Sequence, residues 1–217
     1  MEDLLDNPTG APPPQPNRLK ILNVFGCGGF ASGVASGCFG ELKWGFESDP
    51  SMISTLNGIP SKPRCFKDPF ATELARMVKN ERASASNTEY PVRGDYVDVI
   101  TASLPGDVAN ETNSTMQEVM ILIARLCPRF IVLDGPEELA SPRGCLCLRR
   151  ALSALRTLNY QFRFGVLDCA HFGVPQVRKR AVIIAAAEHL ILPEMPSPIT
   201  YSPSSPDVLT PIRRITV

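Results

Sequence analysis

Short apolar runs of β type alternate with segments of helical spacing along most of this chain, and this alternation limits the possible folds more than any other feature. The expected strands cover residues 19–25, 42–47, 97–104, 129–133, 161–168 and 181–187. The expected helices cover residues 32–37, 70–78, 115–126 and 148–158. Near-continuous apolar strands separated by helices are typical of an α/β fold with a mostly parallel sheet covered on both faces. A loop without a helix joins the last two strands, which predicts an antiparallel edge.

The composition changes at both ends of the chain. Residues 1–17 contain the segment PTGAPPPQP, and residues 193–217 are again rich in Pro and Ser. Such segments are typical of extended linkers rather than of packed structure. We therefore expect a disordered Pro-rich lead-in over residues 1–17, one folded core over residues 18–192, and a surface connection over residues 193–217. A chain of 217 residues is long enough for one substantial core.

Charge and cysteine content restrict the partners and the compartment. Lys plus Arg and Asp plus Glu both number 22, so the formal net charge is zero, whereas a free-standing nucleic-acid binder usually has a basic excess. Any DNA binding by this chain alone is therefore expected to be weak. The seven Cys form no regular framework and no zinc spacing, and the acidic start MEDLLD lacks the apolar segment of a secretion signal. We expect an intracellular protein with reduced thiols, no metal site and no membrane contact.

Three segments have the residue types of a nucleotide-like ligand site. A Gly-rich turn follows the first strand and would let the backbone approach a ligand closely, although a plain tight turn is the alternative. The residues of this turn are Phe25, Gly26, Gly28 and Gly29. Glu47 ends the second strand about twenty residues later, where a carboxylate can accept from ribose hydroxyls or can simply be solvated. Asp68 could accept from an adenine amino group or cap the helix that begins near Phe70.

A polar pattern precedes the last strand. Gln176, Arg178 and Arg180 alternate, so the two Arg side chains project to one side and offer forked donors to a carbonyl or a phosphate. A solvated basic patch is the alternative interpretation of the same residues.

Taken in order, the segments NVFGCGGF, WGFESDP, GDYVDVITASLP, PRFIVLDG and FGVLDCAHFGVPQVRKRAVIIAAA resemble the catalytic domain of the DNA cytosine-5 methyltransferases, most of all the maintenance type. The resemblance covers residues 18–217. It implies a Rossmann-like S-adenosylmethionine-dependent methyltransferase fold, S-adenosylmethionine as methyl donor, and DNA as partner with a flipped cytosine as acceptor. It also implies a nuclear location, and a protein partner is possible.

The same resemblance implies roles for the residues above. The Gly-rich turn would wrap the methionine part of the donor, Glu47 would bind its ribose, and Asp68 would contact its adenine, with Pro105 in the same donor site. Gln176, Arg178 and Arg180 would position the base and support the catalytic loop. The turn is one residue shorter than the usual family motif, and Asn23 replaces a common Asp.

The chain departs from the family at the catalytic positions. The family adds a Cys thiolate to C6 of cytosine, which makes C5 nucleophilic. Its Pro-Cys-Gln motif falls on Pro105, Gly106 and Asp107, so Gly106 stands at the position of the nucleophile and has no side chain. Asp134 stands at the position of the family Glu, keeps its charge and is one methylene shorter. These changes predict a catalytically defective homologue, a pseudoenzyme.

Two other functions remain open from the sequence. The target-recognition region and the last family motif, which would follow the segment IRRITV, are not found, so the expected fold lacks the target-recognition domain. The chain could be part of an active DNA (cytosine-5-)-methyltransferase that missing sequence or another chain completes. It could also be a non-catalytic module that binds DNA or a protein.

Overall fold

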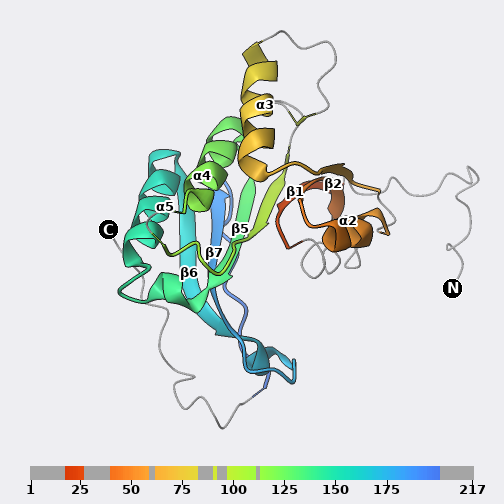
Figure 1. Cartoon of the computed structure of the whole chain (residues 1–217). Coiled ribbons are helices and arrows are strands. Elements are labelled where there is room, and N and C mark those ends of the chain that lie inside the picture. The colour runs from red at the N-terminus through yellow and green to blue at the C-terminus, as the bar shows by residue number, and fades with distance from the viewer. Residues whose placement is uncertain are drawn as a thin grey trace, which may run out of the picture.

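The computed structural model describes residues 18–26, 40–58, 62–82, 90–91, 97–110 and 113–200, without the side chains of 80–82. Within these residues, seven strands form one sheet in the order β3-β2-β1-β4-β5-β7-β6 (Figure 1). The strands are β1 (Leu19–Val24), β2 (Gly40–Phe46), β3 (Arg64–Phe66), β4 (Val99–Ser103), β5 (Phe130–Pro136), β6 (Tyr160–Asp168) and β7 (Lys179–Ala187). The helices are α2 (Pro50–Asn57), α3 (Phe70–Arg82), α4 (Thr115–Leu126) and α5 (Cys145–Thr157), with short 3-10 turns η1 (Glu137–Ala140) and η2 (Cys169–Phe172).

The pairing confirms the expected sheet. Strands β1 to β5 are paired in parallel, and β7 is antiparallel to both of its neighbours, β5 and β6. The antiparallel edge thus lies where the loop-joined last two strands predict it. The expected helix over residues 32–37 lies outside the described residues.

Two helical layers cover the sheet, and the alternation of side chains along β1 separates them. Leu22 and Val24 point into the main core, which also holds the buried faces of α3, α4 and α5. Ile21 points the other way and belongs to a smaller core with Leu56 of α2. Figure 1 shows α3, α4 and α5 side by side on one face of the sheet and α2 apart from them.

Helix α2 is absent from the expectations above, because its apolar stripe is weak. Only Leu56 of this helix is buried, so no clear 3.6-residue period marks the segment. Capping residues define it instead. Oδ1 of Asp49 accepts hydrogen bonds from the Ser51 hydroxyl (2.5 Å) and from the backbone N–H groups of Ser51 (2.8 Å) and Met52 (3.2 Å). These bonds, that of the hydroxyl most of all, lower the pKa of the carboxyl. Pro50 occupies the first turn.

The predicted boundary of the core at residue 192 stays a prediction, but the described chain packs beyond it. Met195 is buried, and the Thr200 hydroxyl donates to the backbone carbonyl of Ala170 at 2.6 Å. The lead-in over residues 1–17 lies outside the described residues. None of the described helices has both the length and the apolar content that crossing a bilayer requires.

A buried polar pair joins the two central strands. Asn23 of β1 is 0% exposed and Thr101 of β4 is 2% exposed, and they are neighbours in the ladder. The Thr101 hydroxyl donates to Oδ1 of Asn23 at 2.7 Å, while Nδ2 of Asn23 donates to the Phe25 carbonyl at 2.8 Å. This chain of hydrogen bonds links the middle of the sheet to the turn that follows β1.

Replacing Thr101 with Val should destabilise the protein by about 1–2 kcal/mol, because the isosteric side chain removes a buried donor to Asn23. Urea denaturation followed by circular dichroism measures the change. Thr157→Val, at an exposed position of α5, is the matched control and should change the free energy of unfolding by less than about 0.5 kcal/mol. Equal stability of both variants would show that the hydroxyl of Thr101 contributes nothing.

Candidate functional site

The carboxyl ends of the parallel strands meet at one edge of the sheet, which is where α/β folds bind ligands. The turns after β1, β2 and β4 hold five of the predicted site residues. Phe25 and Gly26 follow β1, Glu47 follows β2, and Pro105 and Gly106 follow β4. Gly28 and Gly29 lie outside the described residues.

The turn after β1 has an unusual backbone. Phe25 and Gly26 both have φ near +59°, and the backbone N–H of Phe25 donates to the Phe46 carbonyl at 3.0 Å. A Cβ on Gly26 would lie 2.5 Å from Cβ of Ser103. Only Gly therefore fits here, and the turn is pressed against the end of β4.

Glu47 presents one carboxylate oxygen that the described part of the protein leaves unoccupied. The residue is only 7% exposed, and its Oε1 accepts from the backbone N–H groups of Ser48 (2.9 Å) and Asp49 (3.1 Å). No hydrogen bond from a described residue reaches Oε2. A buried acceptor fixed by its own backbone suits a hydroxyl donor such as that of a ribose.

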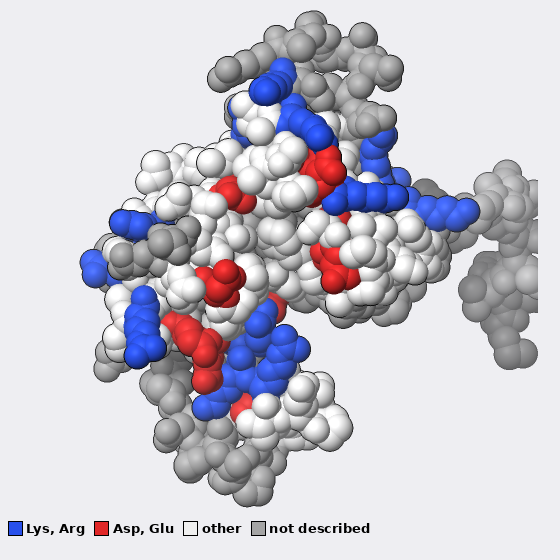
Figure 2. Space-filling view, in the orientation of Figure 1, with Lys and Arg blue, Asp and Glu red and all other residues white. Residues whose placement is uncertain are grey.

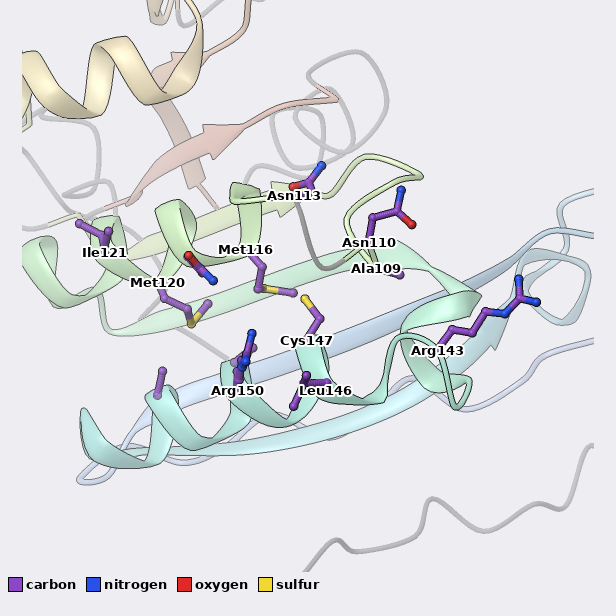
Figure 3. A pocket seen from close by; sticks show the side chains of 13 residues that line it. Ala109, Asn110, Asn113, Met116, Met120, Ile121, Arg143, Leu146, Cys147 and Arg150 are labelled. Carbon is purple, nitrogen blue, oxygen red and sulfur yellow. The ribbon is translucent and has the colours of Figure 1, made fainter.

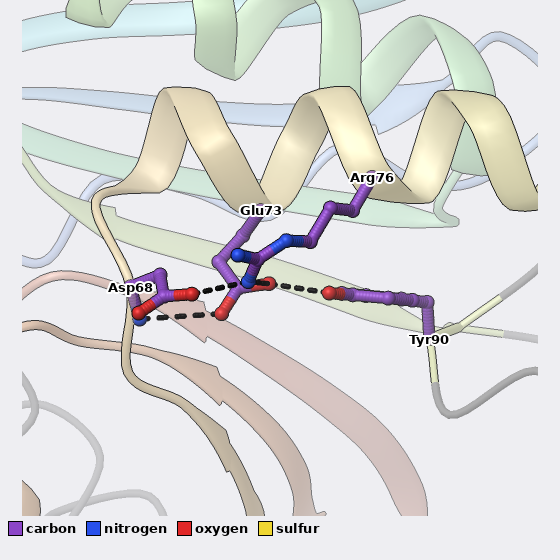
Figure 4. A network of polar contacts seen from close by, with 4 residues as sticks. All are labelled: Asp68, Glu73, Arg76 and Tyr90. Carbon is purple, nitrogen blue, oxygen red and sulfur yellow. Dashed lines mark hydrogen bonds and ion pairs between the residues drawn. The ribbon is translucent and has the colours of Figure 1, made fainter.

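Asp68 follows β3 and belongs to a polar cluster with Glu73, Arg76 and Tyr90 (Figure 4). Its Oδ2 forms an ion pair with Nη1 of Arg76. Within the described residues its carboxylate makes no hydrogen bond to the backbone of α3, whose first turn instead bonds to the Pro69 carbonyl. Asp68 is thus held as a side-chain acceptor at the edge of the sheet and does not act there as a helix cap.

A second cluster lies at the ends of β4, β5 and β7. Oδ1 of Asp134 accepts from the Ser103 hydroxyl at 2.6 Å. Its Oδ2 accepts a hydrogen bond from Nε of Arg180 at 2.8 Å and forms an ion pair with Nη2 at 2.7 Å. Nη2 of Arg180 also lies 3.5 Å from the Leu104 carbonyl, just before the turn of Gly106. The carboxylate and the guanidinium therefore connect three strands beside Gly106.

The structure does not bring all of the predicted base-binding residues to this cluster. Gln176 and Arg178 are exposed in the connection between η2 and β7, while Arg180 points to Asp134. Asp168 organises that connection, since its Oδ1 accepts from the backbone N–H groups of Ala170 and Arg178. Figure 2 shows Lys and Arg side chains gathered at the lower end of the molecule, where β6 ends and β7 begins.

The Asp134–Arg180 pair should contribute to stability, because its side chains are 22% and 18% exposed and an ion pair this far removed from water leaves an unpaired charge when one partner is deleted. A double-mutant cycle with Asp134→Ala and Arg180→Met should give a coupling energy of about 1–3 kcal/mol by urea denaturation.

The control cycle is the pair of Arg129 and Asp98, at 3.2 Å, in which the Arg is 52% exposed. Its coupling should stay below about 1 kcal/mol. Equal coupling energies in both cycles would contradict the importance of the Asp134 cluster.

A separate pocket of about 210 Å³ lies between α4 and α5 (Figure 3). Met116 and Met120 of α4 face Cys147 of α5 across it, and Ala109 and Asn110 close one end. Those two residues belong to the same connection as Gly106. The sequence places Met116 and Met120 on the apolar face of a helix but gives no sign of the pocket, because its existence depends on how α4 and α5 pack.

Burial raises the pKa of the Cys147 thiol, so a smaller fraction is thiolate at neutral pH and alkylation should be slow. Iodoacetamide labelling followed by mass spectrometry should show Cys147 reacting several-fold more slowly at pH 8 than the exposed Cys145 on the same helix. The difference should narrow as the pH rises toward the raised pKa. Faster reaction of Cys147 would mean that the pocket is open to solvent and activates the thiol.

Among the described residues, no cluster of three His, Cys, Asp or Glu side chains could hold a metal ion. Two pairs of titratable groups stand out instead, Asp134 with Arg180 and Asp68 with Arg76. The sequence singled out both carboxylates, but the partner Arg76 and the buried Glu73 carry no motif and were missed.

Comparison with known proteins matches this chain to one family. The profile of the family described as C-5 cytosine-specific DNA methylase matches residues 20–216. The chain is 29% identical over 196 residues to DNA (cytosine-5)-methyltransferase PliMCI of Paracentrotus lividus, with 84% of this chain and 12% of that protein covered. DNA (cytosine-5)-methyltransferase 1 of Mus musculus is also 29% identical over 196 residues, with the same coverage of 84% and 12%. The chain thus spans only about an eighth of the length of these relatives.

Solved structures share the fold at low identity. Spodoptera frugiperda DNMT2 has a TM-score of 0.58 at 15% identity, covering 81% of this chain and 52% of that one. The Dnmt2 methyltransferase of S. pombe also has a TM-score of 0.58, at 14% identity, covering 87% of this chain and 52% of that one. The likeness confirms the expected Rossmann-like fold of S-adenosylmethionine-dependent methyltransferases.

Proposed function

We propose, because this chain belongs to the C-5 cytosine-specific DNA methylase family, that it is a DNA cytosine-5 methyltransferase homologue that keeps a donor site but does not transfer methyl groups. Family membership implies S-adenosylmethionine as the methyl donor, in agreement with the sequence-based expectation. The observation that carries the proposal is Gly106, which leaves the position of the nucleophile without a side chain.

The described part of the donor site fits the cofactor. Glu47 provides a buried acceptor for a ribose hydroxyl, and Asp68 provides an acceptor at the next strand end. Gly26 lets the turn after β1 pack directly against Ser103 of β4. When bound there, S-adenosylmethionine supplies an activated methyl group. These residues would bind and orient it, and none of them depends on Gly106.

The acceptor side lacks the group that activates the base. C5 of cytosine becomes nucleophilic only after a thiolate adds to C6. Gly106 offers no atom for that bond, and the nearby Ser103 hydroxyl already donates to Asp134. Both oxygens of Asp134 accept hydrogen bonds from the protein, so fewer of its lone pairs can face a base. The reaction therefore lacks its first step.

The other described thiols are poor substitutes. Cys65, Cys127, Cys145 and Cys169 lie on other elements than the turn after β4. Cys147 shares a pocket with Ala109 and Asn110, but burial raises the pKa of its thiol, which disfavours the nucleophilic thiolate. We therefore propose structural roles for these cysteines.

The proposal includes DNA as the ligand class and the nucleus as the location, both by family resemblance. The exposed Arg178 and Lys179 beside the Asp134 cluster support a contact with phosphate, although the zero net charge argues for weak binding by this chain alone. Since the chain spans 12% of its relatives' length, a longer protein or another chain that completes the site is the competing proposal. A non-catalytic interaction module is compatible with the same features.

Two measurements on the full chain test the proposal. Calorimetry should detect S-adenosylmethionine binding, since the donor residues do not involve Gly106. Labelled methyl groups should not be incorporated into a cytosine-containing duplex above background, because the turn after β4 contains no Cys. Loss of a nucleophile costs on the order of a million-fold in another enzyme class, which is beyond detection here.

Gly106→Cys is the matched variant. A Cβ at position 106 would meet no heavy atom within 4 Å, so the new side chain fits without a clash. Incorporation in this variant alone would assign the defect to the missing thiol. Clear incorporation by the unsubstituted chain would overturn the proposal, and absence of donor binding would overturn the retained donor site.

A further inference from the structure

The buried carboxylate of Glu73 organises the end of β3. Glu73 lies in the first turn of α3 and is 4% exposed. Its Oε1 accepts from the backbone N–H of Asp68 at 3.2 Å, and its Oε2 accepts from the Tyr90 hydroxyl (Figure 4). Nη1 of Arg76 lies 3.6 Å from the same Oε2. One carboxylate thus holds a backbone group, a phenol and a guanidinium.

Tyr90 fixes this cluster to the aromatic core. Its ring stacks on Phe66 of β3 with centroids 4.6 Å apart and planes at 12°, and Phe66 stacks in turn on Phe46 of β2 at 4.8 Å. Burial, together with the hydrogen bond to Glu73, raises the pKa of Tyr90 to about 12. Tyr90 therefore stays a protonated donor to Glu73 over the whole physiological range.

Arg76 connects the buried Glu73 carboxylate to the carboxylate of Asp68. Its guanidinium binds Oδ2 of Asp68, and this contact raises the pKa of Arg76. An ion pair whose side chains are 50% and 49% exposed is weak when isolated, so the buried Glu73 is what makes the position of Arg76 definite. The backbone of Asp68 is tied to Glu73 as well. The buried Glu73 therefore fixes the backbone N–H of Asp68 directly and the carboxylate of Asp68 through Arg76.

The two carboxylate oxygens of Asp68 differ in their contacts with the described residues. Oδ2 is occupied by Arg76, whereas no described residue donates to Oδ1. A carboxylate oxygen accepts hydrogen bonds and cannot donate them. It can therefore pair with an exocyclic amino group, and it repels a carbonyl oxygen at the same place on a purine.

We infer that Arg76, held by Glu73, is a positioning residue that aims Oδ1 of Asp68 and thereby selects a 6-amino purine over a 6-oxo purine in the donor nucleoside. The inference rests on the donor site of the proposed function and adds its specificity determinant. Neither Arg76 nor Glu73 has to contact the cofactor for this role. Their effect passes through Asp68.

Calorimetry with two product-type ligands tests the inference on the full chain. The probes are S-adenosylhomocysteine and S-inosylhomocysteine, which differ in the amino and carbonyl groups of the purine. The unsubstituted chain should prefer the adenosyl ligand at least about tenfold, because an analogue that leaves a charged acceptor unpaired binds that much more weakly. Asp68→Ala should remove the preference.

Arg76→Met should reduce the preference several-fold, and Arg76→Lys should restore part of it. Adding Arg76→Met to Asp68→Ala should change nothing further, because Arg76 acts only through Asp68. Lys79→Met, at an exposed position of the same helix, is the matched control and should leave the preference intact. A general loss of structure would lower the affinity for both ligands equally and would leave their ratio unchanged.

The outcomes separate this inference from the proposed function. Binding of both ligands with an unchanged ratio in Arg76→Met would overturn the role of Arg76 and leave the donor site standing. An additive effect of Arg76→Met in the Asp68→Ala background would also overturn it. Binding of neither ligand by the unsubstituted chain would overturn the donor site, and this inference with it.

Discussion

Five parallel strands that end at one edge of the sheet are the constraint on which the rest of the structure depends. The turns after β1, β2, β3 and β4 and the last residues of β5 meet there because the strands share a direction. The hydrogen bonds from Thr101 through Asn23 to Phe25 connect this edge to the middle of the sheet. The sheet and these hydrogen bonds therefore hold the turns in place whichever side chains the turns carry.

The sequence predicts most of the fold, because apolar periodicity and loop length determine the six longer strands, the main helices and the antiparallel edge, but not the three-residue strand β3. It does not predict α2, whose single buried residue, Leu56, gives no period. Glu47 could be predicted from its place at a strand end and Asp68 from its place before the helix at Phe70, whereas Asp134 follows only from the resemblance to the family. Arg76 and Glu73 could not, since their roles come from tertiary contacts along α3. The pocket beside Cys147 depends on helix packing in the same way.

The donor and acceptor sides of the proposed site differ in the residues that they retain. On the donor side, carboxylates remain at the expected strand ends, and the turn at Gly26 is packed too tightly for any side chain. On the acceptor side, Asp134 is engaged by Ser103 and Arg180, which ties β4, β5 and β7 together. Asp134, which by resemblance stands at a catalytic position, therefore also has a structural role. This explains how a stable sheet edge can persist beside Gly106 when the thiol is absent.

The proposed loss of methyl transfer requires that no sulfur of this chain can add to a cytosine ring. Trapping with duplex DNA that contains 5-fluorocytosine, in the presence of S-adenosylmethionine, measures this directly. After a thiol has added to C6 and the methyl group has moved to C5, fluorine occupies the place of the proton whose loss would release the thiol, so the protein remains covalently bound to the DNA. On a denaturing gel the full chain should migrate as free protein. A shifted, DNA-bearing band that disappears when one cysteine is replaced by Ser would contradict the proposed loss of methyl transfer and would identify the nucleophile.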